Sequence, residues 1–312
     1  MRPFQATSGV DRQLPAGDEI FLDHVAHFVS DKDAARNRLM SLGFMPTPFS
    51  IQTNREADGT ERLTGTGNTT AMLPRGYLEF LFKTADTPLG REFDEGNARY
   101  VGIHLIAFGV ADAKAQRERL AGSGFAVQPL VALRRPVGTE TGTAEAAFTV
   151  ARVEAGEMAE GRIQMLTHHT EDAVWQKRWL AHGNGVRELI DVAIAVPNLA
   201  EADSRFARFL NRKSVASDFG RAFFLNRGGV QLLDAAAFAR ILPEFRVPTL
   251  PFIGMVALGV ERLDATESVL ASAGLPIMKR DRMLIAPFPS ELGIGAWAFV
   301  ETAADLPWRA HS

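Results

Sequence analysis

LDHVAHFV, at residues 22–29, is the first of four similar strand-like stretches that decide the fold of this 312-residue chain. Such self-similarity is typical of a fold built from repeated units. When the four cores are aligned, His24 and His104 fall at the same place, where the later copies have Asp191 and Gly254. One half of the chain is therefore expected to carry a site and the other to support it. The later stretches are IHLIAFGV at 103–110, LIDVAIAV at 189–196 and IGMVALGV at 253–260.

Each stretch is followed by an amphipathic segment that ends in glycine or asparagine, which predicts a helix with a stop signal. Short apolar runs come next, separated by turn residues such as the Pro-Arg-Gly at 74–76. Each unit is thus a strand, a helix and about three strands, and its apolar sheet face must pair with another. The sequence therefore predicts an α+β chain of four units in two domains. The expected helices cover 31–43, 112–124, 198–211 and about 262–274.

A change of pattern near the middle of the chain marks the boundary between these domains. Between Thr170 and Arg187 the repeat is interrupted by Trp175, Trp179 and a Gly-Asn-Gly run. The four units either satisfy one another within one chain or leave an edge that forms a homodimer. The expected parts are an N-terminal arm (1–19), a first domain (20–170), a connector (171–186), a second domain (187–302) and a C-terminal tail (303–312).

Composition excludes several classes of protein. The chain is 46% hydrophobic and 23% charged, as is usual for soluble globular proteins. No apolar run approaches the roughly 20 residues of a membrane-spanning helix, and the first residues lack the apolar centre of a secretory signal. We therefore expect a cytoplasmic protein without a membrane partner. The net charge of -3, with both signs interspersed, argues against nucleic acid. The absence of cysteine excludes disulfides and thiolate zinc sites.

The chain resembles the vicinal oxygen chelate (VOC) superfamily, and most closely its glyoxalase-like branch. The resemblance covers about residues 20–170 well and the second half as a degenerate repeat. It implies four βαβββ modules paired into two glyoxalase-like domains, each shaped as a cup that holds a divalent metal in many members. Function does not follow from fold alone, because members include glyoxalases, epimerases, resistance enzymes and ring-cleaving dioxygenases. The motifs that carry the resemblance are LDHV at 22–25, GTGN at 65–68, GYLEFL at 76–81 and GIHL at 102–105.

In this superfamily the metal ligands lie on the first and last strands of each module. The resemblance places them at His24, Glu79 and His104, with Gln164 at the fourth place, where glutamate is common. It implies one divalent ion, Fe, Mn, Zn, Ni or Mg, with positions open for water and substrate oxygens. Gln164 would be a weak fourth ligand, or would hydrogen-bond substrate or metal-bound water.

The residues themselves give partial support to such a site. Glu79 interrupts an otherwise apolar run, and a buried carboxylate is costly without a metal or a cation beside it. The competing interpretation is that each histidine is a core residue whose ring nitrogens have hydrogen-bond partners within the protein. His168 shares a strand face with Gln164, which makes it a candidate catalytic acid or base, with a polar strand end as the alternative. Arg134-Arg135 is interpreted as a surface pair, and an anchor for an anionic substrate is the less favoured hypothesis.

The leading hypothesis is a metal-dependent enzyme that acts on a small oxygen-bearing substrate. Lyase or isomerase chemistry is favoured over ring cleavage, because the resemblance puts the ligands in the first half, whereas two-domain extradiol dioxygenases usually keep theirs in the second. The alternative is a metal-free protein that binds or sequesters a small molecule in the same cup. Gln164, in place of the usual glutamate, favours that alternative.

Overall fold

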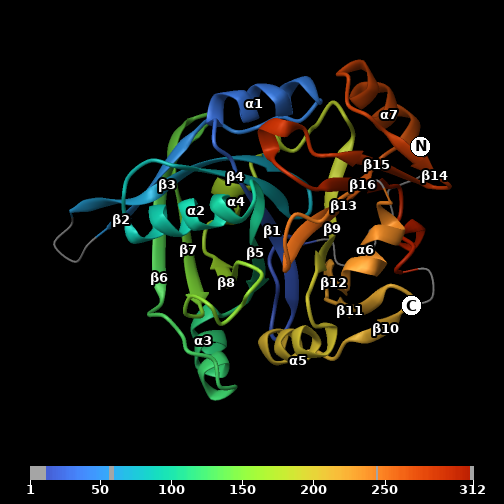
Figure 1. Cartoon of the computed structure of the whole chain (residues 1–312). Helices are drawn as coiled ribbons and strands as arrows, with labels where there is room; N and C mark the ends of the chain where they lie inside the picture. The colour runs from blue at the N-terminus through green and yellow to red at the C-terminus, as the bar shows by residue number, and fades with distance from the viewer. Residues whose placement is uncertain (1–11, 56–59, 244, 310–312) are drawn as a thin grey trace.

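The computed structural model describes residues 12–55, 60–243 and 245–309, so residues 1–11 of the expected arm lie outside the described part. The described strands form one continuous 16-stranded sheet with helices packed on it (Figure 1). The first half of the chain contains β1 (Ile20–Phe28), α1 (Lys32–Ser41), β2 (Ser50–Arg55), β3 (Glu61–Met72), β4 (Tyr77–Lys83), α2 (Pro88–Arg99), β5 (Gly102–Val110), α3 (Ala113–Gly122), β6 (Val131–Thr139), β7 (Gly142–Arg152) and β8 (Arg162–His168).

A short connector and the second half follow the same plan. The connector contains α4 (Glu171–Val174) and a 3-10 turn, η1 (Lys177–Trp179). The second half contains β9 (Val186–Ala195), α5 (Leu199–Leu210), β10 (Val215–Ser217), β11 (Gly220–Phe224), β12 (Gly229–Leu233), α6 (Ala235–Ile241), β13 (Phe252–Val260), α7 (Leu263–Ser272), β14 (Met278–Arg280), β15 (Met283–Pro287), η2 (Ser290–Leu292), β16 (Ala296–Val300) and η3 (Ala303–Asp305).

Strand pairing confirms the four βαβββ modules and their grouping into two domains. In each module the first strand pairs in parallel with the last, as in β1 with β4 and β5 with β8. Two modules meet through their antiparallel first strands, β1 with β5 and β9 with β13. Each half is therefore an eight-stranded array. The two arrays meet through one ladder pair, Ile253 with Ile103, and through the isolated bridges Phe21–Arg227, Arg75–Glu188 and Gly102–Ile294. The orders are β2-β3-β4-β1-β5-β8-β7-β6 and β10-β11-β12-β9-β13-β16-β15-β14.

The first helix of each of the first two modules begins and ends at equivalent residues. Asp31 caps α1 by accepting from two backbone N–H groups, and Asp112 caps α3 in the same way. The chain then leaves each helix through a glycine in the left-handed region, Gly43 at φ 80° and Gly124 at φ 85°. The two capping residues are 81 residues apart (112 − 31), and so are the two glycines (124 − 43). This offset relates equivalent residues of the first two modules.

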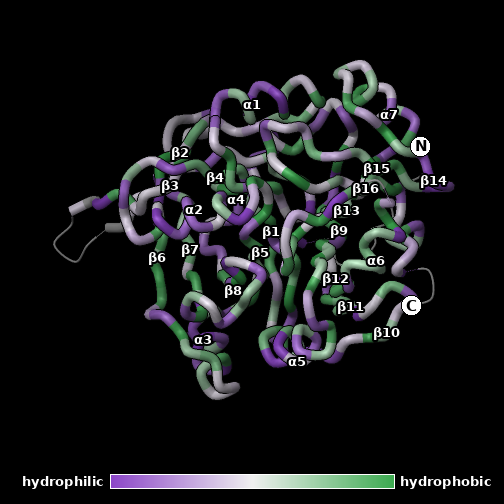
Figure 2. The backbone as a smooth tube through the Cα atoms, viewed as in Figure 1, coloured by the Kyte–Doolittle hydropathy of each residue, from purple (hydrophilic) through white to green (hydrophobic). Residues whose placement is uncertain are grey.

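Each array has one face toward the helices and one face that forms a cup. The helix-side faces of both arrays share one hydrophobic core, which joins Leu39 of α1 and Phe206 of α5 to the central strands. Hydropathy in Figure 2 follows this division, with apolar central strands and polar outer surfaces on α1 and α3. Two smaller apolar clusters lie on the cup faces, one in each half. Within the described residues, no helix is long and apolar enough to span a membrane.

Candidate functional site

The first cup, the open face of the β1–β8 array, contains a cavity of about 70 Å³. Its wall combines apolar side chains from β4, β5, β7 and β8 with a smaller set of polar ones. Such a mixture is typical of small-molecule sites, where a few polar groups fix the orientation of a largely apolar ligand. The polar and charged lining residues are His24, Gln52, Thr53, Asn68, Tyr77, Glu79, Arg134, Arg135, Arg152, Arg162 and Gln164.

A buried carboxylate orients His24 at the base of this cup. The Nδ1 atom of His24 lies 2.7 Å from Asp23, and His168 Nε2 lies 2.9 Å from the other oxygen of the same carboxylate. Burial by itself would raise the pKa of Asp23, but the charge of His168 and the hydrogen bonds from both histidines hold it well below its usual range. An ionised Asp23 accepts N–H groups from both rings. It therefore directs the Nε2 atom of His24 away from itself.

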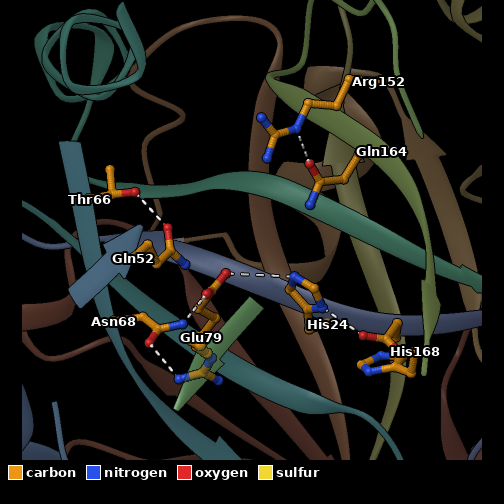
Figure 3. A network of polar contacts seen from close by, with 10 residues as sticks. His24, Gln52, Thr66, Asn68, Glu79, Arg152, Gln164 and His168 are labelled. Atoms are coloured by element: carbon orange, nitrogen blue, oxygen red, sulfur yellow. Dashed lines mark hydrogen bonds and ion pairs between the residues drawn. The ribbon is translucent and has the colours of Figure 1, made fainter. Parts of the chain in front are cut away.

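Glu79 is the residue toward which His24 Nε2 points. The two groups are 3.6 Å apart, and Figure 3 shows this contact at the centre of the polar network. Asn68, on the neighbouring strand β3, donates to the other oxygen of Glu79 at 2.5 Å. The ring of His24 also stacks on Tyr77, with centroids 4.3 Å apart. Three strands thus hold an imidazole and a carboxylate face to face at the cavity.

Two arginines with uncharged hydrogen-bond partners also line this cup. Arg152 donates through Nε to Gln164 Oε1 at 3.0 Å, as Figure 3 shows. Arg135 reaches Asn68 Oδ1 at 3.5 Å. Burial lowers the pKa of Arg152 to about 10, with the charge of Arg162 adding to the effect, so Arg152 remains protonated at neutral pH. Burial also lowers the pKa of Arg135.

His104 does not join His24 and Glu79, which corrects the expected ligand set. Its Nε2 atom donates to the backbone oxygen of Tyr100 at 2.6 Å, and its ring packs on Tyr100 and Phe28. The side chain lines a different cleft, of about 260 Å³, beneath α2. Burial lowers the pKa of His104 to about 4, so the ring is neutral there. The structure brings together His24, Glu79 and Gln164 and leaves His104 outside.

A one-residue shift explains this difference. The helix caps relate the modules by 81 residues, so Asp23 is equivalent to His104 and His24 to Leu105. The strand register agrees, because Asp23 is the extra residue of a bulge in β1 and His104 that of a bulge in β5. Leu105 lines the first cup, as His24 does. The place expected for a second histidine is therefore apolar.

His168 contacts Asp23 and is not among the residues that line the cavity. Its ring is buried against Phe148 and Trp175 while Nε2 contacts Asp23. The acid or base role expected for His168 stays a prediction. Asp23 and Arg152 were missed by sequence reasoning. The adjacency of Asp23 to His24 was a usable signal, whereas Arg152 reaches the cup only through strand pairing.

The donors around the cavity do not fit the three-ligand metal site of the hypothesis. Beside His24 and Glu79, the third donor is Gln164, whose amide oxygen is already bonded to Arg152. Leu105 offers no donor, and two guanidinium groups oppose a further cation. Among the residues that the structure describes, no cluster of three or more His, Cys, Asp or Glu side chains is arranged to hold a metal ion.

The second cup, the equivalent face of the β9–β16 array, is filled by the chain itself. Asp191, which takes the place of His24, binds Arg309 through both carboxylate oxygens, at 2.5 and 2.7 Å. Trp308 Nε1 donates to the same carboxylate at 2.8 Å. Gln231, at the place of Glu79, lies 3.4 Å from Asp191. Two residues of the expected tail, Trp308 and Arg309, thus bind within this cup, and residues 310–312 lie outside the described part.

Comparison with known proteins agrees with this architecture. A family model described as a glyoxalase-like domain matches residues 22–210. No curated protein matches the chain significantly. A hypothetical protein from Staphylococcus aureus is similar in structure, with a TM-score of 0.63 and 11% identity over 90% of this chain and 98% of that chain. A mutant 4-hydroxymandelate synthase from Streptomyces coelicolor gives 0.59 and 14% over 94% and 96%.

A third similar structure is a Mn(II)-bound glyoxalase from Novosphingobium aromaticivorans. Its TM-score is 0.49 and its identity 13%, over 95% of this chain and 85% of that chain. A likeness at this level carries no inference about the site. The two stronger structural matches, at 11% and 14% identity, show the fold alone.

Proposed function

Because the chain belongs to the glyoxalase-like domain family of the VOC superfamily, we propose that its first cup catalyses proton transfer on a small oxygen-bearing substrate, with His24 as the acid–base residue. In an isomerase reaction the proton removed beside a carbonyl group is returned at another atom of the same molecule. In a lyase reaction its removal is followed by loss of a leaving group from the adjacent carbon. The observation that carries this proposal is the alignment of Asp23, His24 and Glu79 at the cavity.

The chemistry of the three side chains supports this role. Asp23 accepts the Nδ1–H of His24, so a neutral ring exposes a basic Nε2 atom toward the cavity. A base held this way is oriented for one proton in a bound substrate. Glu79 lies within 3.6 Å of Nε2 and is placed to share or accept the transferred proton. The amide N–H groups of Gln164 are available to a substrate oxygen, because Oε1 is the atom that accepts from Arg152.

No step of this proposal passes through a metal ion. The expected metal dependence rested on His104 as a third ligand, and Leu105 stands at the equivalent place in the cup. Ring-cleaving chemistry is not carried over either, because it would need such an ion to bind dioxygen.

A second candidate function is metal-free binding or sequestration of a small molecule. It is favoured by the partners that Glu79 and Gln164 already have within the protein, Asn68 and Arg152. A cup whose polar groups are satisfied in this way is ordered in advance for a ligand, and such preorganisation raises affinity.

Hydrogen–deuterium exchange separates the two functions. Small ketones, aldehydes and 2-oxo acids incubated with the protein in D₂O are followed by proton NMR for loss of the signal beside the carbonyl. We expect exchange by the wild type and a loss of about 10² to 10⁴-fold in His24→Ala. His169→Ala, which removes an exposed histidine bonded to Thr149, is the matched control.

Three results would contradict this role for His24. They are equal exchange by His24→Ala and wild type, loss of exchange on addition of EDTA, and binding of these compounds without exchange. The second would restore a metal-dependent function, and the third would favour sequestration.

A further inference from the structure

We propose that Arg135 and Arg152 recognise the carboxylate of a small organic acid in the first cup. This inference deepens the function proposed above and rests on it, because it names the class of substrate that the site would take. The two side chains come from β6 and β7 and line the same cavity, where Arg135 reaches Asn68 and Arg152 reaches Gln164. They differ from the other arginines of the cup because, among the described residues, neither lies within ion-pair distance of a carboxylate.

The partners of the four lining arginines show this difference. Arg134 pairs with Glu145 at 2.5 Å, and Arg162 pairs with Glu92 at 2.8 Å. Arg152 contacts the uncharged Gln164, and Arg135 the uncharged Asn68. Neither of these two makes an ion pair with a carboxylate of the described residues, which are 12–55, 60–243 and 245–309. The first cup thus contains two guanidinium groups whose charges are not individually neutralised.

The charges that line the cavity do not cancel. Glu79 is the acidic residue of the lining, and it faces His24 and Asn68. One carboxylate therefore stands against both Arg135 and Arg152. A buried charge without a partner is costly, and a bound anion removes this cost. A planar guanidinium presents its donors in a fork that matches a carboxylate, which makes arginine the preferred residue for this recognition.

The rest of the lining defines the body of the ligand. The apolar part of the lining includes Leu81, Leu105, Leu133, Phe148 and Leu166. A ligand whose carboxylate binds the arginines would lay its apolar part on these side chains. Its reacting carbon would then lie toward His24. A cavity of about 70 Å³ favours a small acid over a peptide or a nucleotide.

Strand geometry also resolves the meaning of the Arg134-Arg135 pair in the sequence. Successive side chains of a strand point to opposite faces. Arg134 is exposed and neutralised by Glu145, whereas Arg135 is partly buried and bonded across to β3. The surface-pair interpretation therefore holds for Arg134 alone. Arg135 fits the less favoured hypothesis of an anion anchor.

Binding measurements on matched acids and neutral compounds test this assignment. The probes are benzoate, phenylacetate and 2-oxobutanoate, each compared with benzamide, phenylacetamide and 2-butanone respectively. Calorimetry on the wild type should give at least tenfold tighter binding of the acids. Arg152→Gln and Arg135→Gln should each reduce this preference by about tenfold, the loss expected for a charge-assisted hydrogen bond.

The controls separate this inference from the proposed function. Arg134→Gln removes a neutralised charge on the same strand and should retain the preference for acids. His24→Ala should retain it as well, even if proton exchange is lost. If Arg152→Gln does not fold, as judged by circular dichroism, Arg152→Lys keeps the charge and should retain part of the preference. Equal binding of acids and neutral compounds, or an equal loss in Arg134→Gln, would overturn the assignment.

Discussion

The two cups are formed by the same arrangement of strands, but the first contains a cavity and the second contains the chain's own C-terminal residues. In the first, His24 and Glu79 face a cavity; in the second, Asp191 and Gln231 stand at the same places and contact one another. Trp308 and Arg309 fill the second cup from the end of the described chain. The difference teaches that a polar residue of a cup can take its partner from the chain's own C-terminal residues, as Asp191 does, since a buried polar group needs a partner.

The signs of the charges sharpen this comparison. In the second cup the wall supplies a carboxylate and the plug supplies a guanidinium, so the pair is complete within one chain. In the first cup the wall supplies guanidinium groups, and no segment of the described residues brings a carboxylate to Arg152. The second cup therefore illustrates, with reversed signs, the pairing that we infer for the first cup and its ligand.

The largest expected effect comes from breaking the plug of the second cup. Asp191→Asn removes the buried carboxylate charge that Arg309 binds through two hydrogen bonds. Loss of one partner from a buried pair typically costs about 3–5 kcal/mol. We expect the free energy of unfolding, measured in urea, to fall by about that amount.

The matched control for this variant lies in the first cup. Glu79→Gln is the same kind of neutralisation, but it removes a carboxylate that makes no arginine pair among the described residues. We expect its free energy of unfolding to remain within about 1 kcal/mol of the wild type, because site residues are seldom chosen for stability. Equal destabilisation by both variants would remove the distinction between an open site and a closed structural one.

A second difference between the halves is the presence of buried histidines in the first. Burial lowers the pKa of His27 to about 4, with the nearby charge of His104 adding to the effect, and His104 has a pKa of about 4 as well. Their equivalents in the second half are Ile194 and Gly254, at offsets given by the helix caps. Acid sensitivity should therefore originate in the first array.

The sign of this effect follows from proton binding in the unfolded chain. A free histidine titrates near pH 6.5, whereas these two stay neutral in the fold down to about pH 4. The unfolded state binds more protons in this window, so stability is complete above pH 6.5 and is lost as the pH falls toward 4. At pH 5 we expect a loss of about 2 kcal/mol for each ring. Urea unfolding at pH 7.5 and pH 5 measures it, and a flat profile would contradict the burial of these rings.

Much of the fold could be predicted because its signals are local. Side-chain caps such as Asp31 recur in three of the modules, left-handed stop residues and apolar strand cores recur in all four, and the VOC resemblance supplied their pairing. The site was less accessible to sequence reasoning, because strand bulges decide which face a residue occupies. Matching the strand cores put His24 and His104 at the same place. An anchor on the helix caps would have matched His104 with Asp23 and Leu105 with His24.

Other features depend on contacts that sequence patterns do not encode. Arg152 reaches the cup by pairing opposite Gln164, a contact between separate strands. Trp308 and Arg309 looked like parts of a tail because they follow the last strand, yet they bind Asp191 across more than one hundred residues. Only the folded structure shows that the carboxylate of Asp191 is paired with a cation, the guanidinium group of Arg309.

The smallest expected effect tests the one-residue shift directly. Leu105→His places an imidazole at the position equivalent to His24, on a strand that lines the same cavity. With His24 and Glu79 it would complete two imidazoles and one carboxylate, a donor set that suits divalent transition metals. We expect Co²⁺ or Zn²⁺ to bind this variant at least tenfold more tightly than the wild type, which is about 1.4 kcal/mol. The matched variant is Ile103→His, on the residue that precedes His104 and packs in the helix-side core. It should give no gain in metal affinity. Calorimetry measures the metal affinity of both variants. An equal increase in affinity in Leu105→His and Ile103→His would contradict the structural equivalence of Leu105 and His24.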